Sequence, residues 1–211
     1  MKDVRLIFEK RGSLRFISHL DMNRFFTRVM RKSGLDIWYT EGFNPHPYIT
    51  FALPLSLGFE STYEIVDFRV NDENLSFSEI ENAIKAVVPS EIVIIKAVNP
   101  VLKTGKIAFT KYNIEFANEN DAKEFFAFLS KESVVISKRT KRGEIKEMDV
   151  AEKLESVAEI TPNTVELILP AGNDNINPST LVAAFAKEKD TDITVSYLRT
   201  ALLDSDKNYF I

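Results

Sequence analysis

The stretch Lys2–Gly34, KDVRLIFEKRGSLRFISHLDMNRFFTRVMRKSG, decides how the chain begins to fold. Residues 2–9 alternate Val4, Leu6 and Phe8 with mostly charged neighbours, which is the period-two pattern of a strand. After a basic turn, Ser18 precedes Asp21 by three residues, an arrangement that resembles a capping box at a helix start. The residues that follow predict one apolar helix face, made of Met22, Phe25, Phe26, Val29 and Met30. Gly34 is placed to end this helix.

The elements that follow continue a recognisable order. Strands are expected at residues 36–40, 48–53, 61–70 and 91–98, and a helix beginning at Ser76 or Ser78 and carrying Ile80, Ile84 and Val87. Gly and Pro make residues 42–47 a loop. Strand, helix, strand pair, helix and strand is the split βαβ order of a ferredoxin-like fold.

The second half repeats this plan less regularly. Strands are expected at residues 106–117, 133–138, 154–160, 164–169 and 193–203, and helices at 119–130 and 178–188. The predicted fold class is therefore α+β, with two tandem ferredoxin-like (split βαβ) sandwiches. Asn99-Pro100 marks the predicted boundary between a domain of residues 1–99 and a domain of residues 100–211, which contains a basic turn at 138–146.

The composition excludes several classes of chemistry. The chain has 211 residues, 45% hydrophobic and 27% charged, which is typical of a globular protein. It has no cysteine, so disulfides, thiol catalysis and cysteine-held metal clusters are excluded within it. No run approaches the roughly 20 apolar residues of a membrane span, and the N-terminus lacks the apolar stretch of a signal peptide. We expect a cytoplasmic protein without a membrane partner.

The net charge of −4 hides two basic segments. Residues 1–48 carry nine Lys and Arg against five Asp and Glu, and residues 138–146 carry five against one. Such segments in an acidic chain indicate a local anion site. On the predicted first helix, Arg24, Arg28 and Arg31 recur at i, i+4 and i+7, opposite the apolar face. The start of this helix near Ser18 and His19 also offers backbone N–H groups suited to phosphate.

The segment Gly42–Pro47, GFNPHP, is an unusually restricted loop. Its two prolines fix their own φ angles and push the preceding residues, Asn44 and His46, into extended conformations. A stiff loop of this kind can hold an amide, an imidazole and the neighbouring Phe43 against a ligand at little entropic cost. In the second half, the basic tip at 138–146 can contact phosphates without reading a base sequence.

The candidate catalytic residues are His46 and His19, the two histidines in the chain. A histidine can act as general base or acid in phosphodiester cleavage. A metal held by both histidines and Asp21 has suitable ligand types but no diagnostic spacing, so no metal site is assigned. The candidate substrate-binding residues are Arg15, Ser18, His19, Arg24, Arg28, Arg31, Phe43, Asn44, His46, Lys138, Arg139, Lys141, Arg142 and Lys146.

Several motifs in this chain resemble one bacterial family. They are Gly12–Asp21 (GSLRFISHLD), Gly42–Pro47 (GFNPHP) and Phe51–Gly58 (FALPLSLG), with Lys141–Gly143 and Arg199-Thr200 later in the chain. They resemble the uncharacterised radical-SAM-linked family, a domain fused to radical SAM proteins or encoded beside them. The resemblance implies a radical SAM protein as partner. The iron–sulfur cluster and S-adenosylmethionine would belong to that partner, and no cofactor is expected in this chain.

Three hypotheses follow. The leading one is a non-catalytic accessory module that works with a radical SAM enzyme and binds RNA or another phosphate-bearing substrate. The second is an enzyme of RNA processing or other phosphoryl chemistry that uses His46 or His19. The third is a protein–protein adaptor that docks through the acidic residues 147–211. The substrate, the oligomeric state and the orientation of the two halves stay open.

Overall fold

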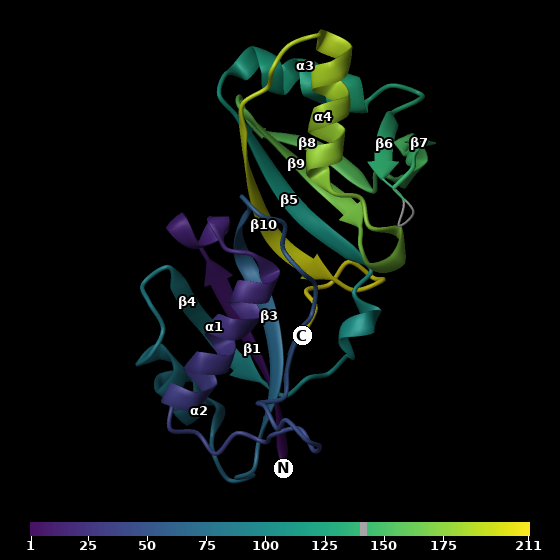
Figure 1. Ribbon diagram of the computed structural model, residues 1–211. Coiled ribbons are helices and arrows are strands. Elements are labelled where there is room, and N and C mark those ends of the chain that lie inside the picture. Colours follow the sequence, from purple (N-terminus) through teal and green to yellow (C-terminus); the bar gives the residue numbers. More distant parts are fainter. Residues whose placement is uncertain (140–142) are drawn as a thin grey trace. The chain divides into compact units, whose positions relative to one another are not determined.

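The computed structural model describes residues 1–139 and 143–211 (Figure 1). The chain forms two compact units: unit 1 consists of Met1–Ile107 with Asn208–Ile211, and unit 2 of Ala108–Lys207. The C-terminal residues therefore belong to unit 1, which the predicted boundary at Asn99-Pro100 did not anticipate. The backbone N–H groups of Val101 and Leu102 both donate to the Ile211 carbonyl oxygen at 3.3 Å, which ties these two distant segments together.

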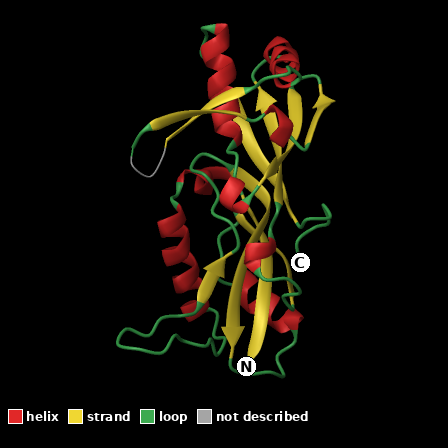
Figure 2. Ribbon diagram, turned by 90° about the vertical axis from the view of Figure 1, so that its right-hand side faces the viewer, coloured by secondary structure: helices red, strands yellow, loops and turns green. Residues whose placement is uncertain are grey.

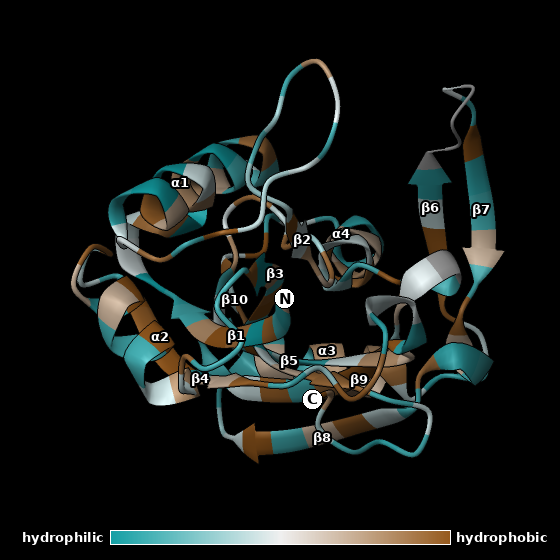
Figure 3. Cartoon of the chain, turned by 90° about the horizontal axis from the view of Figure 1, so that it is seen from below, coloured by the Kyte–Doolittle hydropathy of each residue, from teal (hydrophilic) through white to brown (hydrophobic). Residues whose placement is uncertain are grey.

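Unit 1 has the predicted order of elements. They are β1 (Lys2–Lys10), η1 (Gly12–Phe16), α1 (His19–Lys32), β2 (Ile49–Phe51), β3 (Glu60–Val70), α2 (Phe77–Lys85), β4 (Ile92–Val98) and η2 (Thr104–Lys106). The expected strand at 36–40 is reduced to two isolated bridges, Ile37 with Val70 and Tyr39 with Pro47. The residues beyond these bridges form a loop that stands away from unit 1 (Figure 3).

The sheet of unit 1 is antiparallel throughout. β1 lies between β4 and β3, and β2 pairs with β3. Alternation along β1 directs Val4, Leu6 and Phe8 toward one core, which they share with residues of α1 and α2. Both helices therefore cover the same face of this sheet (Figure 1). The residues between, such as Arg5, lie on the opposite face, because side chains alternate along a strand.

Local sequence signals explain both helices of unit 1. Ser18 caps α1. Most of the predicted apolar face of this helix is buried, namely Met22, Phe26, Val29 and Met30. Ser76 and Glu79 form a reciprocal capping box at the start of α2. These contacts satisfy N–H groups that a helix start leaves without partners.

Unit 2 combines a four-stranded sheet, two helices and a separate hairpin. Its elements are β5 (Phe109–Phe116), α3 (Glu119–Leu129), β6 (Val135–Arg139), β7 (Ile145–Asp149), η3 (Ala151–Lys153), β8 (Ser156–Thr161), β9 (Thr164–Pro170), η4 (Gly172–Asp174), α4 (Pro178–Lys189) and β10 (Val195–Leu203). The sheet order is β10-β5-β9-β8, and all three pairings are antiparallel. The chain is α+β, as predicted.

The core of unit 2 is built around phenylalanines. Phe125 of α3 lies 5.1 Å from Phe116 of β5 and 5.5 Å from Phe185 of α4, measured between ring centroids. Such aromatic pairs add about 0.5–1.5 kcal/mol beyond the area that they bury. The hairpin β6–β7 pairs only with itself and projects from this unit (Figure 2).

Candidate functional site

Helix α1 presents three arginines on its exposed face. Ser18 begins the helix by accepting a hydrogen bond from the Asp21 N–H at 3.1 Å, and the apolar face packs into the core. Arg24, Arg28 and Arg31 are all exposed, because their spacing keeps them off the buried face. Arg24 forms an ion pair with Asp21 at 3.1 Å. Arg28 and Arg31 form none with the residues that the structure describes, which leaves two unpaired guanidinium groups on α1.

The first turn of α1 already carries a negative charge. The Asp21 carboxylate accepts a hydrogen bond from the Ser18 hydroxyl at 2.7 Å and another from Arg24, and these bonds hold the pKa of that carboxyl below its usual value. We expected the helix start near Ser18 and His19 to receive a phosphate. Its own carboxylate stands there instead, and it repels a second anion. An anion would therefore meet less repulsion on the part of α1 beyond this turn.

Arg15 lies in η1, immediately before α1. Its guanidinium group is 3.8 Å from the Glu60 carboxylate and lies 4.8 Å from the ring centre of Phe16. The Arg15 carbonyl accepts a hydrogen bond from the Gly58 N–H at 2.8 Å, which fixes η1 to the start of β3. The charge of Arg15 is thus partly compensated, unlike that of Arg28 and Arg31.

His19 lies beside two buried charged residues, Lys10 and Glu64, that no sequence pattern had indicated as functional. Its ring meets Phe51 edge-on at 5.4 Å, and its Nε2 lies 3.0 Å from the side-chain nitrogen of Asn23. Together with Lys10 and Glu64 it lines a cavity of about 10 Å³, close to the space of one water molecule. Lys10 is 3% exposed and Glu64 is 4% exposed. The sequence pattern around Lys10 and Glu64 does not distinguish them from charged residues on an exposed strand face.

The loop 40–47 is closed on itself. Thr40 donates its N–H to the His46 carbonyl at 2.9 Å, and the His46 Nδ1 lies 3.1 Å from both the Thr40 hydroxyl and the Asn44 carbonyl. Asn44 and His46 are exposed, and Phe43 is completely exposed at 105% of its reference area. A fully exposed phenylalanine on a proline-stiffened loop is available to stack on a ligand.

No hydrogen bond or ring contact among the described residues joins His19 to His46. Arg15, at the start of the α1 region, is held to Gly58 and Glu60 at the first residues of β3. The residues just before the loop 40–47 are held to the last residues of β3, because the Trp38 N–H donates to the Arg69 carbonyl at 2.9 Å. Glu60 and Arg69 lie at opposite ends of β3, about 30 Å apart at the rise of an extended strand. His19 itself contacts Phe51, which pairs with Val66, three residues from Arg69. The two imidazoles share no neighbour among their contacts.

The hairpin β6–β7 places two lysines directly opposite one another. Lys138 pairs with Lys146 in the strand register, and both are exposed. Lys138 also donates to the Asn175 carbonyl at 3.3 Å. Arg139 ends β6 opposite Ile145, whereas Lys141 and Arg142 lie outside the described residues. Like charges opposite one another destabilise a sheet, so this pair costs the hairpin stability.

The described residues contain neither a cluster of metal-ligating side chains nor a membrane-spanning helix. No group of three or more His, Asp or Glu side chains in ranges 1–139 and 143–211 is arranged to hold a metal ion. Among the helices of those ranges, none has the length and apolar character needed to cross a membrane.

Comparison with known proteins assigns the chain to a family. A search of curated proteins finds no match to this chain. A bacterial family model matches residues 4–178, a range that includes α1, the loop 40–47 and the hairpin β6–β7. The chain therefore belongs to the family described as "Uncharacterized protein conserved in bacteria" (DUF2344).

Proposed function

We propose that this protein is a non-catalytic binding module that holds RNA or another phosphate-bearing substrate for a radical SAM enzyme. The observation that carries the binding part is the pair Arg28 and Arg31, which are exposed on α1 and form no ion pair with the described residues. A guanidinium group without a protein partner is available to a phosphate oxygen, and its fork-shaped donors fit that group well.

Two further features support a polyanionic substrate. Lys138 and Lys146 face each other on the hairpin, and a bound phosphate would relieve their repulsion. Phe43 is fully exposed and can stack on a base, as aromatic residues do in proteins that bind single-stranded nucleic acids. Charge and stacking together favour RNA over a small inorganic anion at these surfaces.

The radical SAM partner rests on the motif resemblance given above. A radical SAM enzyme needs a cysteine-bound iron–sulfur cluster, and this chain has no cysteine. The cluster and S-adenosylmethionine are therefore assigned to the partner. Co-expression of the chain with radical SAM proteins from the same bacterium, followed by co-purification, tests this assignment. Failure to form a complex with any of them would remove the partner from the proposal.

We also infer that both units are ferredoxin-like. In unit 1 the first strand lies between the fourth and the third, and the second strand pairs with the third. In unit 2, β5, β8, β9 and β10 take the same relative positions, with β6–β7 as an insertion. An experimental structure in which the strand order of either unit differs would contradict this inference.

The binding proposal predicts a specific dependence on salt. Binding of RNA to basic residues releases counterions, so the logarithm of the association constant falls linearly with the logarithm of salt concentration. Replacing both Arg28 and Arg31 with Glu should weaken binding to total bacterial RNA at least tenfold. The slope should become shallower by between about 1 and 2, because two phosphate contacts are lost.

A matched control distinguishes the effect of losing Arg28 and Arg31 from the effect of a changed net charge. The variant Lys123→Glu with Lys187→Glu makes the same charge change on exposed residues of α3 and α4. It should keep most of the affinity and the original slope. Equal loss in both double variants, or unchanged binding in a folded Arg28/Arg31 variant, would overturn the proposal.

An enzyme remains the second candidate, and one observation favours it. His19 lines the same small cavity as the buried Lys10 and Glu64, so three titratable groups gather beside the start of α1. In this candidate His19→Ala abolishes turnover of RNA or nucleotide substrates while binding survives. Absence of turnover by the unaltered protein, alone and with its partner, would exclude it.

A further inference from the structure

The sheet face of unit 1 that points away from α1 and α2 carries a larger cavity. Its volume is about 470 Å³, within the usual range of small-molecule sites. The residues that matter for its chemistry are Asp3, Arg5, Tyr48, Asp67, Arg69 and Lys103. None of them belongs to the surface proposed above for RNA.

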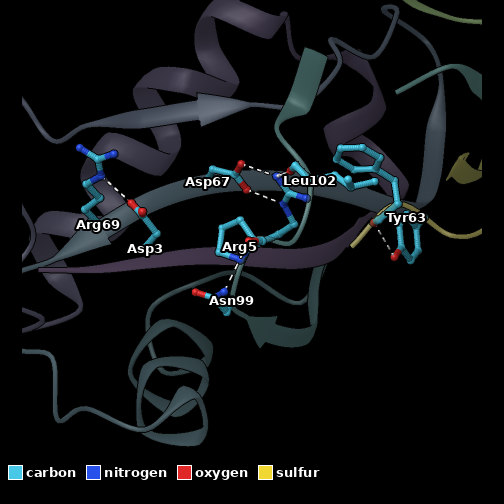
Figure 4. Close-up of polar contacts among 9 residues, drawn as sticks. Asp3, Arg5, Tyr63, Asp67, Arg69, Asn99 and Leu102 are labelled. Carbon is cyan, nitrogen blue, oxygen red and sulfur yellow. Dashed lines mark hydrogen bonds and ion pairs between the residues drawn. The ribbon is translucent and has the colours of Figure 1, made fainter. Parts of the chain in front are cut away.

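The two acidic residues of this cavity are already neutralised. Asp67 accepts hydrogen bonds from the Arg5 Nε at 2.8 Å and from the Arg5 Nη2 at 2.7 Å (Figure 4). Asp3 forms an ion pair with Arg69, whose pKa this carboxylate raises (Figure 4). The carboxylates therefore repel an incoming anion much less than two free ones would.

One nitrogen of the Arg5 guanidinium and the Lys103 ammonium group remain without a partner within the described part of the chain. The Arg5 side chain is completely buried, and its Nη1 has no hydrogen-bond partner among the described residues. Its Nη2 additionally donates to the Leu102 carbonyl at 2.9 Å, so only Nη1 lacks an acceptor. Lys103, on the segment beside Leu102, is exposed and forms no ion pair within the described ranges.

An unpaired buried donor is costly, and an acceptor from a ligand would remove that cost. A guanidinium nitrogen and an ammonium group both donate and never accept, so they select a negatively charged oxygen. With three basic and two acidic lining residues, the cavity also has an excess of one positive charge. The chemistry of the site therefore specifies an oxyanion.

The wall beside these charges is aromatic. The Tyr48 ring lies 5.6 Å from Trp38, and the Arg69 guanidinium lies 5.1 Å from the Tyr48 ring centre and 5.5 Å from that of Trp38. These contacts hold the Tyr48 ring in place at the cavity. A flat apolar group attached to the oxyanion can rest against it.

We propose that this cavity binds a small organic oxyanion, a phosphate ester or a carboxylate, that carries a flat apolar group. Arg5 and Lys103 hold its negative oxygens, and Tyr48 contacts its apolar part. The site is separate from the α1 part of the proposed RNA surface, because Arg5 lies on the sheet face opposite the core that α1 shares with Val4 and Leu6.

The protein carries its own reporter for this site. Trp38 is the one tryptophan of the chain, and it touches both Tyr48 and Arg69. Titration with phenyl phosphate and with benzoate should change Trp38 fluorescence in a saturable way, whereas phenol should not. A response to phenyl phosphate alone would identify a phosphate ester as the natural class, and a response to benzoate alone a carboxylate. No saturable response to either compound would overturn the proposal.

A pair of matched variants locates the binding. Lys103→Gln should weaken it about tenfold, equivalent to about 1.4 kcal/mol. Lys106→Gln removes an exposed lysine three positions away that does not line the cavity, and it should bind as the unaltered protein does. Equal effects of both variants would contradict the assignment. Arg28→Glu with Arg31→Glu should leave the Trp38 response intact, so failure here and failure of the RNA proposal are distinguishable.

Discussion

Arg5 and Asp67 face each other across β1 and β3 and are joined by two hydrogen bonds, at 2.8 Å from Nε and 2.7 Å from Nη2. The Arg5 side chain is fully buried, whereas the Asp67 side chain is 19% exposed. The Phe210 ring lies 4.8 Å from the guanidinium group, so the C-terminal segment covers one side of Arg5. A buried charge in this position depends on its partner.

Asp67→Ala should lower the free energy of unfolding by about 3 kcal/mol, because it leaves the buried guanidinium unpaired. Urea denaturation measures this change. Replacing both residues, as Arg5→Met with Asp67→Leu, should recover most of it, since no buried charge remains. Glu41→Ala, at an exposed residue of the loop, is the control and should change little. A loss below 1 kcal/mol in Asp67→Ala would show that the pair is structurally dispensable.

We expect ionisation of the Tyr63 phenol to lower the free energy of unfolding at high pH. Burial raises the pKa of its phenol from the ordinary 10.0 to about 12, and its hydroxyl donates to the Phe210 carbonyl at 3.1 Å. The Tyr63 phenol ionises near pH 10 in the unfolded chain and only near pH 12 in the folded chain. Its contribution to the free energy of unfolding is therefore complete below pH 10. It is lost as the pH rises from 10 to 12.

The comparison that isolates this effect is Tyr63→Phe. Unfolding by urea at pH 9, 10, 11 and 12 should show a shallower decline for the variant than for the unaltered protein. Burial also raises the pKa of Tyr197 to about 12. Part of the loss of stability at high pH should therefore remain in both the variant and the unaltered protein. Identical pH profiles for the two proteins would show that Tyr63 ionises normally.

Ser76→Ala should destabilise α2. Ser76 accepts from the Glu79 N–H at 3.2 Å, and the Glu79 carboxylate accepts from the Ser76 N–H at 2.8 Å. Loss of a serine cap costs about 1 kcal/mol, measured by chemical denaturation. The bonds from Ser76 also lower the Glu79 pKa, so the stabilisation by this carboxylate should be present at neutral pH and disappear as the pH falls through its titration range. Ser90→Ala, outside any helix, serves as control.

Lys146→Glu should have opposite effects on stability and binding. It replaces repulsion with attraction opposite Lys138, and a favourable cross-strand pair is worth about 0.5 kcal/mol. Thermal unfolding should therefore occur at a slightly higher temperature, while RNA affinity falls. A variant that loses stability would show that the two lysines do not repel each other in the folded protein.

The element order of unit 1 was predictable because its signals are local. The alternation in β1, the caps Ser18 and Ser76 and the apolar stripe of α1 act within a few residues of sequence. Every predicted element of unit 1 except the strand at 36–40 was found close to its expected range. The exposure of Arg24, Arg28 and Arg31 follows from helical periodicity in the same way.

The contacts within the sites depended on tertiary structure. The sequence does not show that Asp21 neutralises the start of α1, nor that β3 keeps the Arg15 region and the Trp38 region at opposite ends. Both facts arise from side-chain geometry and from pairing between distant segments.

Periodicity and capping are properties of neighbouring residues, so the sequence alone predicted the α+β composition, most of the order of the elements and the exposed basic face of α1. It did not predict β7, and its strand at 36–40 was wrong. Only the tertiary structure decided that Arg5 meets Asp67, that Lys10 and Glu64 are buried beside His19, and that the C-terminal residues return to unit 1. Strand register sets which distant side chains face each other, and burial changes the energy of a charge. Neither property can be read from the chain one segment at a time.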